Sequence, residues 1–512
     1  MHRRLLGIGL ALTTIPFVLA AAPDTVTVDG GQISGTSVNG VRVFKGIPFA
    51  APPIGNLRWK APQPVVPWTG VRAADAFGAW CLQEPYPDGS AYVSAGVTRD
   101  KPGSEDCLYL NVWTAAGAGE KRPVMVWIHG GAWTRGSGAA SAGSDGAALA
   151  RKGVVVVTTN YRLGAFGFLA HPELTAESPQ HASGNFAILD HVAALRWVQK
   201  NIAAFGGDPG RVTIFGESAG SWSVNTVQAT PLAKGLFHCA IGQSGGQFTA
   251  SATLAAAEKA GAAFAKAAGA DSLAALRAVP AEKILATPFR PGINVDGYVL
   301  PDTVRNLFAR KKHSDVPVLV GSNANEWTTL SNPSQFPKTM DAYRQRVNAQ
   351  YGDSVKEYDA AYPVKTDADI AEAVMAVGRD TWFTLQMRTW ARMVTESGKP
   401  AFLYQFTRVP PGPNPAWGAY HAAEIQYAFN NVGTRPWAID VDRRLGDQMS
   451  SYWVNFGTTG DPNGKGLPKW TAYDPNAEPY LELGDTVQIR NHLLKTQLDF
   501  LERFQQRRQD AQ

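Results

Sequence analysis

Short, continuously apolar runs recur along the chain from residue 123 onward. Six of them have the length of a strand and are bounded by Gly, Pro or polar residues: 123–128, 153–158, 211–215, 239–241, 316–320 and 401–406. A strand that is apolar on both faces belongs to a sheet that is covered on both sides. These runs therefore predict the buried strands of a central sheet.

Stretches with helical character lie between these runs. Residues 189–205 repeat apolar side chains at helical spacing, and residues 254–268 are rich in Ala and Lys. Strands that alternate with helices predict an α/β fold, with a mostly parallel central sheet and helices on both faces. Alternating runs at 26–28 and 41–44 predict an antiparallel start, and 493–512 predicts an amphipathic terminal helix.

Composition supports one large folded unit. Of the 512 residues, 45% are hydrophobic and 18% are charged, which suits a sizeable core rather than a disordered chain. Neither an internal repeat nor a low-complexity linker divides the chain, so we expect a single domain over 22–512. The formal net charge of +5 is small and dispersed, so we expect no nucleic-acid partner.

The first 21 residues have the features of a secretory signal peptide. A positive start that includes Arg3 and Arg4 precedes an apolar run over 5–19, and small residues follow at 20–22. That run is shorter than the roughly 20 residues of a membrane span, although an uncleaved anchor is the alternative. We therefore expect an exported protein, periplasmic or secreted, without stable membrane insertion once the signal is removed.

The chain has three cysteines, Cys81, Cys107 and Cys239. An odd count in an oxidising compartment suggests one disulfide and one remaining thiol. Cys81 and Cys107 flank a loop rich in Gly, Pro, Ser and Asp, so they are the expected pair. Cys239 lies inside the apolar run 237–241, which predicts a buried core residue.

The pattern G-x-S-x-G, typical of a serine nucleophile on a strand-to-helix turn, occurs twice. Residues 216–220 place Ser218 at its centre, and residues 242–246 place Ser244 there. A serine hydroxyl needs a neighbouring base and an acid behind it, and in this fold the acid usually follows two strands after the nucleophile. Counting strands from Ser218 leads to Glu326, whereas Ser244 finds no such carboxylate. Ser218 is therefore the predicted nucleophile.

The base must come later in the chain than the acid. Only His421 and His492 follow Glu326. His421 lies in a loop after the sixth apolar run, whereas His492 lies near the end of the chain, so His421 is the better candidate. Asp296 and Asp302 are alternative acids, but they precede the fifth run instead of following it. The predicted triad is Ser218, His421 and Glu326.

A glycine-rich segment follows the first apolar run and predicts a loop of backbone donors. Negative charge that develops on a carbonyl oxygen needs preset N–H groups, worth about 3 kcal/mol each. Gly131, Ala132 and Ala219 are the expected donors. Tryptophans beside the catalytic candidates suggest an aromatic substrate pocket, and core packing explains them equally well. They are Trp133, Trp222 and Trp327.

Metal and cofactor signatures are weak. His171, His181 and His191 recur every ten residues, which is not a ligand spacing for one metal on one helix. No phosphate-binding loop or dinucleotide fingerprint stands in a strand-helix setting. We therefore expect neither a metal nor an organic cofactor.

Several motifs together resemble those of the type-B carboxylesterases, the family that includes cholinesterases and bacterial para-nitrobenzyl esterases. The likeness runs from about Thr25 to about Trp470. The motifs are FKGIPFA at 44–50, SEDCLYLNV at 104–112, WIHGG at 127–131, NYR at 160–162, FGGDP at 205–209 and the elbow at Ser218. The resemblance implies an α/β-hydrolase fold.

The resemblance also implies roles for particular residues. It places the acid at Glu326 and the base at His421, with Glu424 three residues further on. It implies a Cys81–Cys107 bridge and two ion pairs near the site, Arg58–Glu105 and Arg162–Asp190. The chain departs from the family pattern in having Ala132 for the third glycine of the oxyanion loop and His191 for a common glutamine. It also lacks the cysteines for the second disulfide of animal cholinesterases.

The expected activity is hydrolysis of a small-molecule carboxylic ester through an acyl-enzyme intermediate. An amidase, peptidase or lactone hydrolase could use the same triad, and a non-catalytic binding protein could share the same fold. Neither the natural substrate nor the oligomeric state follows from these residues.

Overall fold

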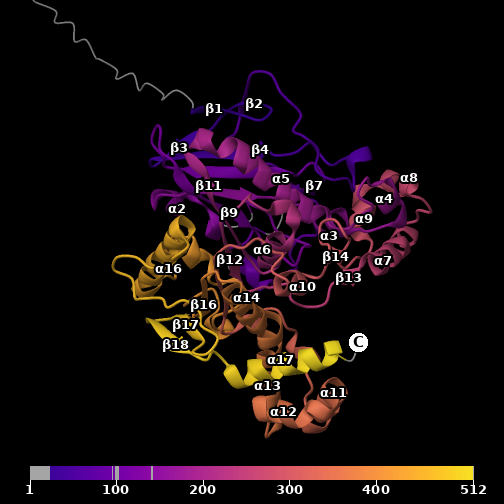
Figure 1. The fold of residues 1–512 in the computed structure, drawn as a ribbon, viewed down its shortest axis with the longest axis vertical. Coiled ribbons are helices and arrows are strands. Elements are labelled where there is room, and N and C mark those ends of the chain that lie inside the picture. Colours follow the sequence, from indigo (N-terminus) through magenta and orange to yellow (C-terminus); the bar gives the residue numbers. More distant parts are fainter. Residues whose placement is uncertain (1–23, 95, 99–102, 140–141, 511–512) are drawn as a thin grey trace, which may run out of the picture.

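The fold is built on a strongly twisted sheet that crosses the molecule (Figure 1). The computed structural model describes residues 24–94, 96–98, 103–139 and 142–510, so the expected signal peptide at 1–21 lies outside the described residues. The sheet has eleven strands in the order β18-β17-β16-β15-β12-β11-β9-β10-β8-β4-β3. In that order they are β18 (Val487–Asn491), β17 (Pro479–Leu483), β16 (Ala401–Phe406), β15 (Val318–Asn323), β12 (Cys239–Gln243), β11 (Gly207–Glu217), β9 (Arg122–Ile128), β10 (Val155–Thr159), β8 (Tyr109–Thr114), β4 (Val41–Pro48) and β3 (Thr36–Val38).

The centre of the sheet is parallel and its edges are antiparallel. Neighbouring strands run parallel from β17 through to β10. The β17–β18 pair at one edge and the β10–β8, β8–β4 and β4–β3 pairs at the other are antiparallel. The apolar runs form the parallel centre, where both faces are covered, so the prediction of a mostly parallel α/β sheet is confirmed.

Side chains of each central strand alternate between two cores, one on each face of the sheet. In β9, Val124 and Val126 face one core, whereas Met125 and Trp127 face the other. Helices α5 (Phe186–Asn201), α6 (Ala219–Ala229) and α14 (Leu385–Glu396) contribute to the first core. Helices α2 (Ala147–Arg151) and α16 (Asp440–Thr459) contribute to the second.

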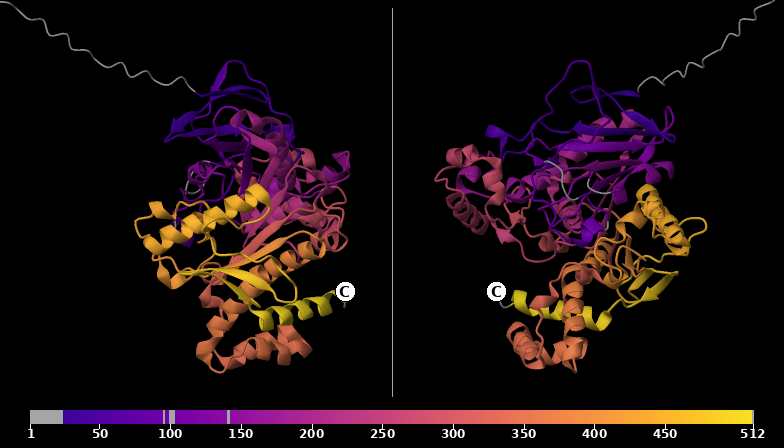
Figure 2. Two further views of the ribbon diagram at one scale, coloured as in Figure 1. Left: turned by 60° about the vertical axis from the view of Figure 1, so that its left-hand side comes forward. Right: turned by 180° about the vertical axis from the view of Figure 1, so that it is seen from behind.

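Other helices pack into two smaller clusters away from the sheet. One cluster contains α3 (Gly164–Phe168), α4 (Pro172–Glu177), α7 (Leu254–Ala267), α8 (Leu273–Ala278) and α9 (Ala281–Ala286). The other contains α11 (Met340–Tyr351), α12 (Val355–Ala361), α13 (Ile370–Arg379) and α17 (Lys495–Asp510), which lie together at the lower end of the views in Figures 1 and 2.

Shorter elements complete the fold. The remaining helices are α1 (Ala91–Ser94), α10 (Val304–Ala309) and α15 (Ile425–Ala428). The remaining strands are β1 (Thr25–Val28), β2 (Gly31–Ser34) and β5 (Val71–Ala73) in one small sheet, with β6 (Trp80–Cys81) paired to β7 (Gly103–Ser104) and β13 (Ala252–Thr253) paired to β14 (Asn294–Val295). In the part of the chain described, no helix combines the length and apolarity needed to cross a bilayer.

The sequence located the central strands closely and two of the strands outside them, β8 and β17, less well. The run 401–406 coincides with β16, and the helix expected over 189–205 begins at Phe186, with a 3₁₀ turn from Ile202 to Phe205 at its end. Strands β8 and β17 were not among the six predicted runs. Both interrupt their apolar residues with a polar one, such as Asn111 in β8, so neither forms a continuous apolar run.

Candidate active site

Ser218 lies at the sharp turn between the end of β11 and the start of α6. Its backbone has φ 56° and ψ −122°, a strained conformation for a residue with a side chain. The flanking glycines permit the close approach that this turn needs. A Cβ on Gly220 would lie 2.1 Å from the carbonyl oxygen of Ile128, and one on Gly216 would lie 2.7 Å from the backbone of Gly220. Such a turn raises the serine side chain above the carboxyl edge of the sheet.

Ser244 makes a similar turn after the neighbouring strand β12. Its φ is also 56°, but the residue is completely buried. Its hydroxyl has no hydrogen-bond partner among the described residues. Ser218 differs because it lines a cavity that it shares with His421. The two G-x-S-x-G segments therefore have a similar backbone turn, but only Ser218 is accessible from the cavity.

Glu326 and His421 are brought together from loops that follow adjacent strands. Glu326 begins a 3₁₀ turn, Glu326–Thr328, shortly after β15, and His421 precedes α15 in the connection that follows β16. Glu326 Oε2 lies 2.5 Å from His421 Nδ1. Glu326 Oε1 accepts a 2.7 Å hydrogen bond from the backbone N–H of Asn323. Both oxygens are therefore engaged, and the imidazole ring is held at one nitrogen.

Direct contacts between the two loops fix this pairing. Asn325 and Tyr420 form an isolated parallel β-bridge. The Asn323 side chain donates a 2.8 Å hydrogen bond to the carbonyl of Tyr420 and a 2.6 Å bond to Glu424 Oε2. These groups are buried, so the bonds are protected from competition by water. The phenyl ring of Phe383 lies 4.9 Å from the His421 ring and packs against it.

The other nitrogen of His421 faces a second carboxylate. His421 Nε2 lies 3.1 Å from Glu217 Oε1, on the residue directly before Ser218. This is a close charge contact, but its angle does not make a hydrogen bond, and Glu217 Oε1 has no hydrogen-bond partner among the described residues. Within the described part of the chain, no hydrogen bond connects Ser218 Oγ to His421. The structure therefore pairs Glu326 with His421, and Ser218 lines the same cavity as His421 without a hydrogen bond to the imidazole.

The buried carboxylates change the protonation of this cluster. Burial acts to lower the pKa of His421, but the carboxylates of Glu217, Glu326 and Glu424 outweigh it and raise that pKa to about 9. Burial raises the pKa of Glu217 well above its usual range. Burial, followed by the charge of Glu326, also raises the pKa of Glu424. The protonation of Glu217 and that of His421 are therefore coupled. A protonated His421 favours the ionised form of Glu217, and a protonated Glu217 favours the neutral form of His421.

The loop after β9 has the backbone shape expected of an anion-binding loop. Gly131, Ala132 and Trp133 all have positive φ, at 103°, 55° and 58°. The carbonyl of Gly131 accepts hydrogen bonds from the N–H groups of Thr134 and Arg135, so the loop is folded on itself. No described residue accepts a hydrogen bond from the N–H of Gly131 or Ala132. These N–H groups are therefore available to a ligand.

Two further features join this loop to the nucleophile turn. Ala219 is the first residue of α6, where backbone N–H groups lack partners within the helix. A Cβ on Gly130 would lie 2.7 Å from Glu217 Oε2 and 3.0 Å from the Cβ of Ser218. The loop and the elbow are therefore in direct contact, and glycine at position 130 permits it.

A cavity of about 740 Å³ opens over these groups. Three segments supply most of its wall: the stretch 86–92, the loop 129–137 and the stretch 417–435. Ser218, Glu217 and His421 also line it. Its size lies within the range of small-molecule sites, roughly 300–1,000 Å³.

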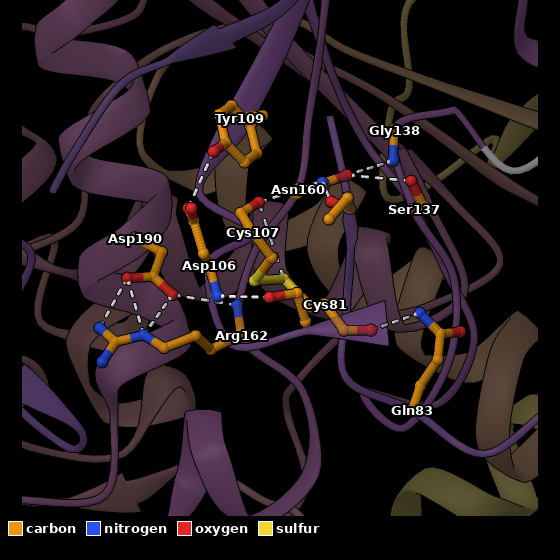
Figure 3. Close-up of a disulfide and its surroundings, with 12 residues drawn as sticks. Cys81, Gln83, Asp106, Cys107, Tyr109, Ser137, Gly138, Asn160, Arg162 and Asp190 are labelled. Atoms are coloured by element: carbon orange, nitrogen blue, oxygen red, sulfur yellow. Dashed lines mark hydrogen bonds and ion pairs between the residues drawn. A yellow bond between two sulfur atoms is a disulfide. The ribbon is translucent and has the colours of Figure 1, made fainter. Parts of the chain in front are cut away.

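The disulfide predicted from the sequence is confirmed, and the loop that it closes includes residues 86–92 of the cavity wall. Cys81 and Cys107 are bonded, and Cys239 is a buried free cysteine, as expected. Figure 3 shows how the bridge is tied to its surroundings. Gln83 donates to the carbonyls of Cys81 and Gly136, at 2.9 and 2.8 Å, and Asn160 donates to the carbonyl of Cys107 at 3.0 Å. The disulfide loop is thus anchored to the end of the oxyanion loop.

Both ion pairs implied by the family resemblance are present. Arg58 and Glu105 approach to 2.5 Å, and Arg162 and Asp190 approach to 2.7 Å. The Arg162 and Asp190 side chains are only 3% and 0% exposed. Asp190 also accepts the backbone N–H of Arg162 at 3.0 Å. This buried pair holds the start of the loop after β10 near the disulfide (Figure 3).

The three tryptophans lie away from the wall of the 740 Å³ cavity, as far as its described lining extends. Trp133 donates its indole N–H to Ser223 Oγ at 2.9 Å, and its ring lies 5.3 Å from that of Trp222. Trp327 lines a separate hollow of about 350 Å³. Core packing accounts for Trp133 and Trp222 in this structure, and a role in substrate binding stays a prediction.

The alternative acids and base have other surroundings. Asp296 Oδ1 accepts the backbone N–H groups of 298–300, and Asp302 Oδ1 accepts a 2.8 Å bond from Asn306. His492 is half-exposed and lies 3.7 Å from Glu478. None of the three is among the described residues that line the cavity.

Sequence reasoning missed the part played by Glu217. It was read only as the variable position of the nucleophile motif, yet its side chain reaches the free nitrogen of His421. The sequence held no local signal for this contact, because successive side chains of a strand point to opposite faces and His421 is distant along the chain. In the described residues, no group of three or more His, Cys, Asp or Glu side chains is placed to hold a metal ion.

Comparison with known proteins places this geometry in context. Residues 22–501 match the sequence model described as "Carboxylesterase family". A fumonisin B1 esterase of Sphingopyxis macrogoltabida is 38% identical over 499 residues, covering 92% of this chain and 88% of that protein. A cocaine esterase of Homo sapiens is 36% identical over 523 residues, covering 93% and 90%.

Solved structures agree over nearly the whole chain. A PNB esterase superposes with a TM-score of 0.80 at 32% identity, covering 94% of this chain and 100% of that one. A carboxylesterase of Geobacillus stearothermophilus superposes with a TM-score of 0.81 at 32% identity, covering 93% and 100%.

Proposed function

This chain belongs to the carboxylesterase family, has the α/β-hydrolase fold and is an ester-hydrolysing enzyme, and we propose that it works through a triad of Ser218, His421 and Glu326. The observation that carries the proposal is the contact of Glu326 with His421 at the base of a cavity that Ser218 also lines. Acid, base and nucleophile come from three separate connections at the carboxyl edge of one sheet.

The reaction proceeds in two acyl-transfer steps. Ser218 Oγ attacks the ester carbonyl while His421 Nε2 accepts its proton, and Glu326 stabilises the imidazolium that results. His421 then gives the proton to the leaving alcohol. Water, activated by the same imidazole, hydrolyses the acyl-enzyme and releases the acid.

The negative charge of each tetrahedral intermediate needs donors that are already in place. The N–H groups of Gly131, Ala132 and Ala219 are proposed to bind this oxygen. The unused N–H groups of the loop and the first-turn position of Ala219 support this assignment. Ala132 keeps the N–H that glycine would offer, while its methyl group faces the cavity that it lines.

The imidazole must change partner during the cycle. In the structure His421 Nε2 faces Glu217 Oε1 at 3.1 Å, and the reaction needs it to face Ser218 Oγ. Hydrogen bonds between catalytic groups are often long before substrate binds and shorten in the complex. Ser218 directly follows Glu217, and we propose that rotation of these side chains exchanges the contacts when substrate binds.

Export and a single-domain organisation are part of the same proposal. The disulfide supports an oxidising compartment, so the chain is proposed to be periplasmic or secreted after removal of residues 1–21. The proposed domain, 22–512, includes the matched residues 22–501. An ester of small size is the proposed substrate, since the cavity volume fits one.

Ser218→Ala tests the mechanism. The purified protein is expected to hydrolyse 4-nitrophenyl acyl esters, and the variant is expected to lose at least about a thousandfold in kcat. Intact mass spectrometry should show an acyl adduct on the wild type only. Peptide anilides, run beside the esters, report the alternative amidase activity. Equal turnover by a correctly folded Ser218→Ala protein would disprove the triad.

A further inference from the structure

Two arginine side chains line the cavity and are not used by the mechanism. Arg135 follows the oxyanion loop, and Arg435 lies in the connection between α15 and α16. Both side chains are half-buried. The guanidinium of Arg435 lies beside Gly96, where a Cβ would come within 2.6 Å of Nη1. The Arg135 guanidinium lies 6.0 Å from the ring centre of Tyr86, another lining residue.

The hydrogen bonding of both guanidinium groups is incomplete. Arg135 uses Nε to donate to the carbonyls of residues 84–85, both at 3.2 Å, and Arg435 uses Nε to donate to Gln426 Oε1 at 3.0 Å. Among the described residues, no acceptor bonds to the Nη atoms of either one, and no carboxylate forms an ion pair with them. Arg408 shows the contrast, because two aspartates neutralise it at 2.7 Å.

The acidic lining residues do not offset these charges. Glu217 lies against His421 at the base of the cavity, 3.1 Å from Nε2, so its charge is paired with the imidazole. Asp88 lies in the wall and is already engaged in an interaction of its own. The open part of the cavity therefore presents two positive groups with free N–H donors.

We propose that the esterase site takes a carboxylic ester that bears a further carboxylate, which Arg135 and Arg435 bind. This inference rests on the proposed function of the site. A guanidinium offers a planar pair of donors that matches a carboxylate, and charge-assisted bonds of this kind are stronger than neutral ones. The Nη atoms of the two lining arginines would donate to the anionic group of the substrate while its ester carbonyl lies at Ser218.

Two pairs of substrates test the proposal, and each pair differs only in one charge. The acyl-side pair is mono-4-nitrophenyl adipate and 4-nitrophenyl adipamate. The alcohol-side pair is 4-acetoxybenzoate and 4-acetoxybenzamide. In at least one pair, kcat/KM is expected to be about tenfold higher for the carboxylate at low salt, and the ratio should fall as NaCl is added.

Variants then assign the charge preference to residues. Arg135→Gln and Arg435→Gln are each expected to reduce the carboxylate-to-amide ratio severalfold, and the double variant should bring it close to one. Arg444→Gln is the matched control, because it removes the same charge from an exposed position of α16 and should leave the ratio unchanged. The ratio is measured within one preparation, so partial misfolding does not affect it.

The outcomes separate this inference from the function on which it rests. A wild-type ratio of one in both pairs, with turnover that Ser218→Ala abolishes, overturns the inference and keeps the mechanism. A ratio that survives the double variant also overturns it. Turnover that persists in Ser218→Ala removes the mechanism instead.

Discussion

Replacing Glu217 by glutamine tests the unexpected contact at the base of the site. The substitution keeps the size of the side chain and removes the charge 3.1 Å from His421 Nε2. At an effective dielectric constant near 20, a charge pair at this separation is worth about 5 kcal/mol. The charge of Glu217 is also the largest single effect that raises the pKa of His421, to about 9, against the opposing effect of burial.

The sign of the expected change follows from the protonation state that catalysis needs. His421 must be neutral to accept a proton from Ser218, so kcat/KM should rise with pH on a limb whose midpoint reports the pKa of His421. Removal of the Glu217 charge disfavours the imidazolium. The midpoint in Glu217→Gln should therefore move from about 9 toward lower pH, by about one pH unit or more.

A full pH profile of kcat/KM with 4-nitrophenyl acetate, taken at constant ionic strength, measures this midpoint. Release of 4-nitrophenol is followed at its isosbestic wavelength. Glu424→Gln is the graded control, because the charge of Glu424 raises the pKa of His421 less than those of Glu217 and Glu326 do. The midpoint should move less in Glu424→Gln than in Glu217→Gln. Thermal unfolding of each variant checks that the fold is kept. An unchanged midpoint in folded Glu217→Gln would refute the electrostatic reasoning.

Three further predictions concern the frame of the site. Gly130→Ala should lower kcat at least tenfold in esterase assays and should also lower Tm, because its Cβ would lie 2.7 Å from Glu217 Oε2 and 2.8 Å from the backbone oxygen of Glu217. Arg162→Met should cost about 3–5 kcal/mol in denaturant unfolding, since it leaves Asp190 buried without its partner; a loss below about 1 kcal/mol would contradict this. Replacing Cys81 and Cys107 together by Ala should cost about 3.5 kcal/mol in the same assay, from the 26-residue separation that the bridge closes, and should raise KM because the loop forms a cavity wall.

Local pattern was sufficient for much of the fold. The strand 401–406 coincides with β16, and the six apolar runs all belong to the central sheet. Counting strands from Ser218 led to Glu326, and the strand order β11-β12-β15-β16 agrees with that count. Strands β8 and β17 were not predicted from the sequence, because polar residues interrupt their apolar residues and leave no continuous apolar run. Whether such a segment forms a strand is decided by the strands and side chains that it packs against.

The surroundings of the candidate site could not be predicted in the same way. Nothing local to Glu217 shows that its carboxylate reaches His421, which lies far away along the chain. Nor does the pattern of residues 86–92 indicate that this stretch lines the cavity over Ser218. For Trp133 the sequence position was misleading. It lies beside the predicted oxyanion donors in sequence, which suggested a place in the substrate pocket, but its ring packs against Trp222 in the core.

The sequence by itself determined the strained serine turn, the buried strands and the pairing of Cys81 with Cys107. Each of these depends on short-range sterics, side-chain period or the small number of cysteines, which are properties of a segment or a count. Only the tertiary structure decided which carboxylate faces each nitrogen of His421 and that Arg135 and Arg435 line the same cavity. Those contacts depend on the order of strands and the packing of loops, because electrostatic and hydrogen-bond energies act through distances in space rather than along the chain.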